Sequence, residues 1–294
     1  MDFRTLLVLV SILFGSGLGG ALHAQPYERT RSDTLSDAPA TLAIDNREGS
    51  ITVSSWSRDG VVYTARIVSG QAQEIVEETM IEVDRFDQRL SLTSNMDEID
   101  PQWAFGPELY GYGVTYPEVH YTVRVPPSVA VTIEDQESTV DIDGLAARLR
   151  VDTQEGAMTV RNHRGPVRLD THEGTLTLTD IVGDATIDTH EGSVEAQGLR
   201  GRLRLDTHEG RAAVAVDSLG PTTIDTHEGE VSLTVPSRTG FDLSTDLGEE
   251  GTLRSDFAID ALRTEDGQYE GRVRGGGPLL RVSSAEGVVQ VLRP

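Results

Sequence analysis

The sequence has no cysteine and no lysine among its 294 residues. Without cysteine the chain can form no disulfide, no thiolate metal site and no lipid anchor on an N-terminal cysteine. All 25 basic residues are therefore arginine, and with 48 acidic residues the formal net charge is -23. So acidic a chain is not expected to bind nucleic acid, because phosphate contacts need clustered basic side chains.

Aromatic residues make up 5% of the chain, and long apolar runs are scarce. The apolar run Leu6–Phe14 follows Arg4 and leads through a Gly-rich stretch to Ala24. This pattern is typical of a secretory signal peptide over residues 1–24, and the run is too short to span a membrane. We therefore expect export to the periplasm, the outer cell surface or the extracellular space, with no transmembrane segment after cleavage.

What the sequence does have is one phrase repeated at a nearly fixed spacing. Asp-Thr-His-Glu-Gly begins at Asp170, Asp188, Asp206 and Asp225, and a copy with Gln in place of His begins at Asp152. The spacings are 18, 18, 18 and 19 residues. A short period of this kind predicts a stacked repeat architecture.

The residues on either side of each phrase alternate between apolar and polar. Val167 and Leu169 precede one copy, and Leu176 and Leu178 follow it. This pattern predicts two short strands per repeat joined at a Glu-Gly corner, with one face buried. A left-handed triangular helix needs an aliphatic residue six positions after Leu169, where Thr175 stands. We therefore expect an all-β fold, a parallel β-solenoid (β-helix) with about 18 residues per rung, and leave its handedness open.

The rest of the chain divides around this array. Asp45–Gly49 resembles the phrase and is expected to form the first rung, while Leu280–Val291 is expected to form the final one. The predicted organisation is a signal peptide at 1–24, a flexible lead at 25–40, an N-terminal β-rich portion of the solenoid with one short helix at 41–128, the regular 18-residue repeat array at 129–248, and a hairpin insertion with a C-terminal capping rung at 249–294.

The strand alternation also predicts which side chains face outward. If Leu169 and Thr171 point inward, then Arg168, Asp170 and His172 point outward. Parallel rungs stack about 4.8 Å apart, so each outward residue would form a column along the molecule. A column of carboxylates repels itself by roughly 1 kcal/mol per neighbouring pair. Arginines two residues before Asp152, Asp170 and Asp206 are expected to offset part of this repulsion.

Three interpretations of these columns remain open. They can be structural features copied by tandem duplication, a divalent-metal site, or a pH-dependent interaction face that uses histidine. A flat ladder presents its ligands side by side, whereas metal sites need three or four convergent ligands. We therefore assign no metal ligands, and the ladder to be tested consists of Asp170, His172, Asp188, His190, Asp206, His208, Asp225 and His227.

A loop at 101–116 contains a third of the chain's aromatic residues. Clustered rings can stack on sugars or anchor a protein partner, or they can plug the open end of the solenoid. The candidate partner-binding or glycan-binding residues in this loop are Trp103, Phe105, Tyr110 and Tyr112.

Taken together, the segments Ile51-Thr-Val53, Trp56, Val125-Pro126 and Gly275–Gly287 resemble the bacterial "putative adhesin" β-strand-repeat family, a domain of unknown function. The resemblance spans residues 40–292. It implies a β-solenoid exposed in the cell envelope, with a role in adhesion and no established catalytic residues. The uniform Asp-Thr-His-Glu phrase departs from the Ser/Thr-Gly-rich corners of that family.

Catalysis requires one asymmetric group of residues, whereas these repeats make every rung alike. The sequence also lacks Gly-x-Ser-x-Gly, His-Glu-x-x-His and a phosphate-binding loop. We therefore expect a non-catalytic adhesion, binding or structural module with no cofactor, whose partner is a cell-surface or envelope protein or a glycan. Self-association of the rods is a further expectation. The alternatives are a periplasmic divalent-metal-binding protein and, third in order, a polysaccharide-acting β-helix enzyme.

Overall fold

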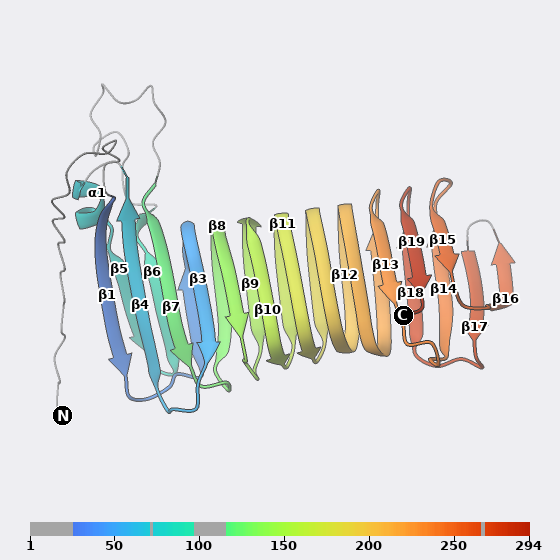
Figure 1. Ribbon diagram of the computed structural model, residues 1–294, viewed down its shortest axis with the longest axis horizontal. Helices are drawn as coiled ribbons and strands as arrows, with labels where there is room; N and C mark the ends of the chain where they lie inside the picture. The colour runs from blue at the N-terminus through green and yellow to red at the C-terminus, as the bar shows by residue number, and fades with distance from the viewer. Residues whose placement is uncertain (1–25, 71–72, 97–115, 266–267) are drawn as a thin grey trace, which may run out of the picture.

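A computed structural model describes residues 26–70, 73–96, 116–265 and 268–294, and within strand β16 it leaves the side chains of 261–265 undescribed. The described chain consists of strands β1 to β19 and one short helix, α1 (Gln73–Glu78). The strands form an elongated row (Figure 1). The prediction of an all-β chain with one short helix is confirmed. No helix in the described ranges combines the length and apolar character that crossing a membrane would require.

The pairing partners divide the strands into two layers. One layer contains, in spatial order, β5 (Ile81–Phe86), β6 (Arg89–Ser94), β2 (Thr41–Asp45), β8 (Ala130–Asp143), β9 (Leu149–Glu155), β11 (Val167–Val182), β12 (Ala185–Thr226), β18 (Leu279–Ser284), β14 (Phe241–Leu247), β17 (Gln268–Val273) and β16 (Asp260–Glu265).

The second layer contains β1 (Tyr27–Leu35), β4 (Val61–Ser69), β7 (Glu118–Val125), β3 (Glu48–Ser55), β8, β10 (Ala157–Arg164), β11, β12, β13 (Glu230–Thr234), β19 (Val288–Leu292) and β15 (Thr252–Ser255). Strands β8, β11 and β12 contribute to both layers because each is long enough to continue around a corner.

In the middle of the molecule the strands of successive repeats pair in parallel and in register. Leu169 lies opposite Ile187 in one layer, and Leu176 lies opposite Val194 in the other. Residues that occupy the same place in the 18-residue period are therefore neighbours along the row. Because strand side chains alternate between faces, the apolar positions of every repeat face the same side.

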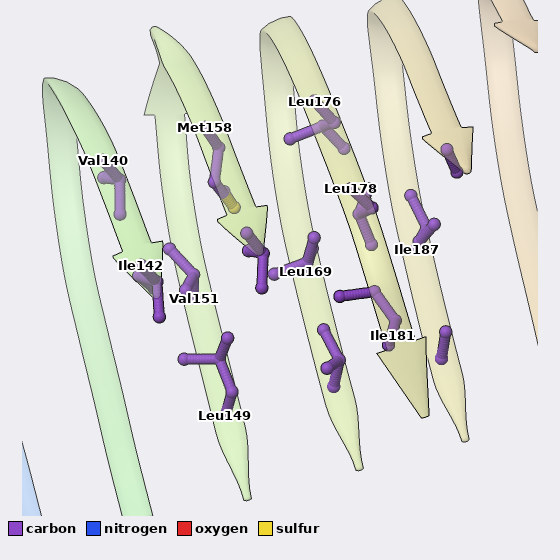
Figure 2. Packing of buried hydrophobic residues seen from close by; sticks show 14 of the residues in the cluster. Val140, Ile142, Leu149, Val151, Met158, Leu169, Leu176, Leu178, Ile181 and Ile187 are labelled. Carbon is purple, nitrogen blue, oxygen red and sulfur yellow. The ribbon is translucent and has the colours of Figure 1, made fainter. Parts of the chain in front are cut away.

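The apolar side chains fill the space between the two layers. Figure 2 shows labelled members of this core, including Leu169 and Leu178 of β11 and Ile187 of β12. These three side chains have no exposed surface. Burial of each such side chain contributes roughly 1.5–3 kcal/mol to folding.

The flexible lead predicted over residues 25–40 is wrong for most of its length. Residues Tyr27–Leu35 form β1, an edge strand that pairs antiparallel with β4. Arg29 and Arg31 donate hydrogen bonds to backbone carbonyls of Thr79 and Ile81, which ties this edge to the segment entering β5. Most of the β1 side chains are exposed on both faces, so the strand lacks the apolar alternation that sequence analysis detects.

The two ends are not stacked in sequence order. The early segment of β2 and β3 pairs directly with β8, with Ile51 opposite Val140. The expected final rung, β18 and β19, does not lie at the end. It pairs with β12 and β13 on one side and with β14 and β15 on the other. In Figure 1 these two strands, in red, lie inside the orange strands β14 and β15.

Candidate interaction surface

The repeated Asp-Thr-His phrase lies where the chain leaves the first layer and turns toward the second. We call one passage of the chain through both layers a winding. Asp170 lies opposite Asp152 on one side and Asp188 on the other, and Thr171 lies opposite Thr189. The threonines are buried, whereas Asp170 and its counterparts are partly or fully exposed. The alternation predicted from the sequence is therefore confirmed, and the outward side chains form columns.

The histidines form a continuous column of rings. The ring centroids of His172 and His190 are 4.7 Å apart with planes at 17°. Those of His190 and His208 are 4.6 Å apart with planes at 70°, and those of His208 and His227 are 4.7 Å apart at 14°. The four imidazoles thus follow the spacing of stacked parallel strands, which makes the face regular over four windings.

The aspartates form a second column beside the rings, and the predicted arginines pair with three of them. Arg150 lies 3.1 Å from Asp152, Arg168 lies 3.3 Å from Asp170, and Arg204 lies 3.5 Å from Asp206. Each such exposed pair stabilises the fold by no more than about 1 kcal/mol. The pairs therefore matter mainly because they neutralise three of the five carboxylates in the column, those of Asp152, Asp170 and Asp206.

Asp188 lacks this compensation because Thr186 stands where the other copies have arginine. Partial burial raises the pKa of Asp188, and the neighbouring carboxylates of Asp170 and Asp206 raise it further. Arg168 and Arg204 act in the opposite direction. The repulsion expected within the column is thus present at Asp188.

A third column of glutamates lies at the corner that follows each histidine. Glu173 lies opposite Glu191, and Glu137 lies opposite Glu155. Near the C-terminal end of the array, His208 lies 3.9 Å from Glu209 and His227 lies 3.8 Å from Glu228. The aspartate, histidine and glutamate columns together make one long acidic surface with imidazoles at its centre.

The buried threonines lie on the inner side of the same corner, and the sequence alone indicates no functional role for them. The Thr171 hydroxyl donates to the Glu173 carbonyl at 3.1 Å, and Thr153 does the same to Glu155 at 3.0 Å. These bonds satisfy hydroxyls that burial would otherwise leave without a partner. The position two residues before the corner glutamate therefore suits a threonine in these two repeats, whereas the buried Thr189 hydroxyl at the equivalent place has no partner.

Asp135 occupies the threonine position in the first regular winding. Its carboxylate accepts hydrogen bonds from Ser138 Oγ at 2.6 Å and from Thr153 Oγ1 at 3.2 Å. Burial raises the pKa of Asp135 to about 6. The 18-residue spacing from Thr153 is the signal that places Asp135 inward, although a carboxylate by itself indicates an outward position.

The ladder does not form a closed metal site. In the portion of the chain covered by the structure, no group of three or more His, Asp or Glu side chains comes together in a way that could hold a metal ion. The other predicted binding residues, Trp103, Phe105, Tyr110 and Tyr112, lie outside the described residues.

No family model matches the sequence, and no curated protein matches it. Several solved structures align with most of the chain. A putative adhesin from Bacteroides fragilis NCTC 9343 is 12% identical, with a TM-score of 0.42 and coverage of 91% of this chain and 97% of that chain.

Two further structures align with similar coverage. A putative lipid binding protein from Parabacteroides distasonis ATCC 8503 is 12% identical, with a TM-score of 0.39 and coverage of 90% and 97%. A putative adhesin from Parabacteroides merdae ATCC 43184 is also 12% identical, with a TM-score of 0.39 and coverage of 90% and 96%. All three TM-scores are below 0.5, so these likenesses do not establish a shared family or function.

Proposed function

We propose that the protein is an exported β-solenoid of the bacterial envelope that acts as a non-catalytic binding module. The observation that carries this proposal is the alignment of identical outward side chains over successive windings. Asp170 opposes Asp188 directly, and the four imidazoles follow at 4.6–4.7 Å. A surface of this kind presents the same chemical group many times at one spacing.

Such repetition favours multivalent binding over catalysis. Each exposed carboxylate or imidazole contributes little by itself, but several weak contacts on one rigid body add up to a strong attachment. A catalytic site instead needs one group of unlike residues held in a single arrangement. The partner that suits an acidic face is an envelope protein or a glycan layer bearing repeated positive charges.

The test is binding of the purified mature protein to isolated bacterial envelope fragments, with fractionation of the producing cells as a check of export. We expect binding that is reversed by salt and weakened at least tenfold when Asp188 and Asp206 are both changed to Asn. The matched control changes Asp141 and Asp143 to Asn, because both belong to the other layer. Equal loss in the control, or release of sugar fragments by the wild type, would contradict the proposal.

Divalent-metal binding is the second candidate, because each imidazole lies beside a carboxylate and close to the next ring. Without three convergent ligands among the described side chains, an ion would be bound by neighbouring windings and water. Calorimetry with zinc, copper, nickel and calcium tests this candidate. Stoichiometric binding that disappears on changing His190 and His208 to Ala would favour metal binding over the display of weak contacts.

A further inference from the structure

The outer face of the first layer carries four columns of side chains along the molecule. Outward residues of one strand are two positions apart, so each winding contributes one residue to every column. In the winding that contains β9, these residues are Arg148, Arg150, Asp152 and Gln154. The pairing of β9 with β11 places Arg150 beside Arg168 and Asp152 beside Asp170. We call these the outer, arginine, aspartate and histidine columns, because histidine replaces Gln154 in the following windings.

The arginine and aspartate columns are neighbours of opposite charge. The arginine column holds Arg150, Arg168 and Arg204, with Thr186 in the winding between the last two. Each of these arginines lies 3.1–3.5 Å from the aspartate of its own winding. The side chains of these pairs are 35–57% exposed, so both charges still reach the surface. The face therefore presents a positive band directly beside a negative one.

Exposed apolar side chains lie in the two flanking columns of the same face. In the described chain, Phe86 is 84% exposed, Met80 52% and Leu279 43%. The pairing of β5 with β6 places Phe86 opposite Arg89, in the outer column, while Met80 directly precedes β5 on the side of the histidine column. Leu279 lies in the outer column at the other end, and Ala285 lies in the histidine column of the same winding. One exposed apolar residue is ordinary, but these three share one face.

We propose that this face binds the same face of a second copy of the chain. The two-fold axis runs along the long axis of the molecule, between the arginine and aspartate columns. Rotation about this axis reverses the order of the columns and keeps every winding at its own height. The arginine column of one copy then faces the aspartate column of the other, so that Arg168 meets Asp170 of the second copy. The outer column faces the histidine column in the same way.

Charge and apolar contact both select this position of the axis. Across the contact, each paired carboxylate lies between an arginine of its own copy and an arginine of the second copy, so the charges alternate. Phe86 meets Met80 of the second copy at one end, and Leu279 meets Ala285 at the other. An axis along the arginine column would instead place arginine against arginine, and an axis along the aspartate column would place carboxylate against carboxylate.

The net charge of -23 opposes the association of two copies. This long-range repulsion is screened over about 8 Å at physiological ionic strength, whereas the paired side chains are in contact. Association should therefore be weak at about 0.01 M salt, where repulsion acts over about 30 Å, and weak again at about 1 M, where the pairs themselves are screened. A dimer held by charge has its maximum between these limits.

This inference rests on the proposed binding function and names its partner. The repeated positive charges that the aspartate column binds are the arginines of a second copy, presented at the same spacing because both columns follow one period. A protein displayed on the envelope would then join to other copies through one face.

Sedimentation velocity of the purified mature protein measures the dimer. Arg150→Glu with Arg168→Glu makes the arginine column acidic, and Asp152→Arg with Asp170→Arg makes the aspartate column basic. Each double variant alone should self-associate at least about tenfold more weakly than the wild type, because like charges then face each other. An equal mixture of the two should form a one-to-one dimer, because both contacts again join opposite charges.

Matched variants control for net charge and for the loss of an exposed ring. Arg161→Glu with Arg211→Glu makes the same charge change on the outer face of the second layer and should leave the dimer unchanged. Phe86→Ser should weaken the dimer about tenfold, as expected for an aromatic ring covered by a partner. Tyr269→Ser, which removes an exposed ring from the other end of the molecule, should not weaken it.

The absence of cysteine allows a second measurement that alters no charge. Leu279→Cys places a thiol in the outer column, and Ala285→Cys places one in the histidine column. A short bismaleimide should link these two variants when they are mixed, but neither to itself, because equivalent residues of the two copies lie about 20 Å apart across the columns. Thr175→Cys mixed with Thr179→Cys, both on the second layer, should give no cross-link.

Three results would overturn the inference: a wild type that stays monomeric at every salt concentration, charge-reversed variants that dimerise alone as well as mixed, or cross-linking of Leu279→Cys to itself. Envelope fragments from cells that lack the protein separate this inference from the proposed function. A monomeric protein that binds these fragments would reject the second copy as partner and leave the proposed function standing. A dimer that binds no fragments would support the inference and reject every other envelope partner.

Discussion

The middle of the molecule and its two ends are built from similar strands but by different rules. In the middle, each strand pairs with the copy of itself in the next repeat, so that Asp170 meets Asp188. At the ends, several strands pair with segments far away in the sequence, and three of the four outermost pairs, β1–β4, β5–β6 and β16–β17, are antiparallel, whereas β15–β19 is parallel. The difference shows that repetition extends the stack, while departures from repetition stop it.

The two ends use the same arrangement. At each end, a winding from the terminal part of the chain lies directly against the array, and a second parallel winding covers it. Antiparallel strands then complete the row, with β1 and β5 at one end and β17 and β16 at the other. An edge that bears exposed charged residues, as β1 does, is protected against pairing with further chains.

The largest expected effect comes from a corner glycine of the middle. Gly174 has φ of +141°, and an added Cβ would collide with the carbonyl oxygen of Gly156 on the preceding winding. We predict that Gly174→Ala lowers the free energy of unfolding by about 3–5 kcal/mol, because both the backbone strain and the collision are unavoidable. Urea denaturation followed by circular dichroism measures this loss.

Gly275 at the C-terminal end is the matched control. Its φ is +86°, but a Cβ there would meet no atom within 4 Å. Gly275→Ala should therefore lower the free energy of unfolding by only about 1–2 kcal/mol, the effect of the backbone conformation alone. Equal losses at the two positions would mean that close stacking of the corners does not distinguish the middle from the ends.

A second prediction concerns His163, a polar residue of the middle whose neighbour in the next repeat is apolar. His163 lies opposite Ile181, has no exposed surface, and neither ring nitrogen has a hydrogen-bond partner. Burial lowers the pKa of His163, and the nearby backbone groups of Ala147 and Pro166 oppose this shift without meeting the geometry of a full hydrogen bond. We predict that His163→Leu raises the free energy of unfolding at pH 7 by about 1–3 kcal/mol, because it removes polar atoms without partners.

The pH dependence of the free energy of unfolding gives a further test of this prediction. Because the folded state lowers the pKa of His163, the unfolded chain takes up the proton more readily. The wild type should therefore be most stable above about pH 6.5 and lose up to about 1.4 kcal/mol per pH unit as the pH falls. His163→Leu should flatten this decline, whereas Ile181→Leu should leave it intact. An unchanged decline in the His163 variant would show that other groups cause it.

Much of the middle could be predicted from the sequence, because its signals are local. The inward direction of Thr171 and the pairing of Arg168 with Asp170 both follow from strand alternation and a fixed period. The signal fails where a side chain breaks the usual link between polarity and exposure. Asp135 and His163 are polar residues at inward positions: the 18-residue period places them beside Thr153 and Ile181, but their polarity alone indicates an outward position.

The ends could not be predicted in the same way, because their order depends on which segments meet in space. The copy around Val282 has the same pattern wherever it is placed, so the sequence could not show that β18 lies inside β14. Strand β1 lacks a buried face altogether.

The smallest expected effect separates two neighbouring members of the aspartate column. Asp188 has a raised pKa and no arginine partner, whereas Asp170 pairs with Arg168 at 3.3 Å. We predict that Asp188→Asn raises the free energy of unfolding by a few tenths of a kcal/mol at pH 7, the scale of solvent-screened charge interactions. Asp170→Asn should give no such gain, because it removes an attraction together with the repulsion.

Salt and pH test the electrostatic origin of this difference. The gain from Asp188→Asn should shrink in about 0.5 M sodium chloride, where surface charges are screened over a few ångströms. It should also vanish as the pH falls and Asp188 takes up a proton, because the raised pKa makes the charged form the unfavourable one in the folded state. A gain that persists at high salt and low pH would instead mean that the asparagine acts through packing. Charge repulsion in the aspartate column would then not distinguish the middle of the molecule from its ends.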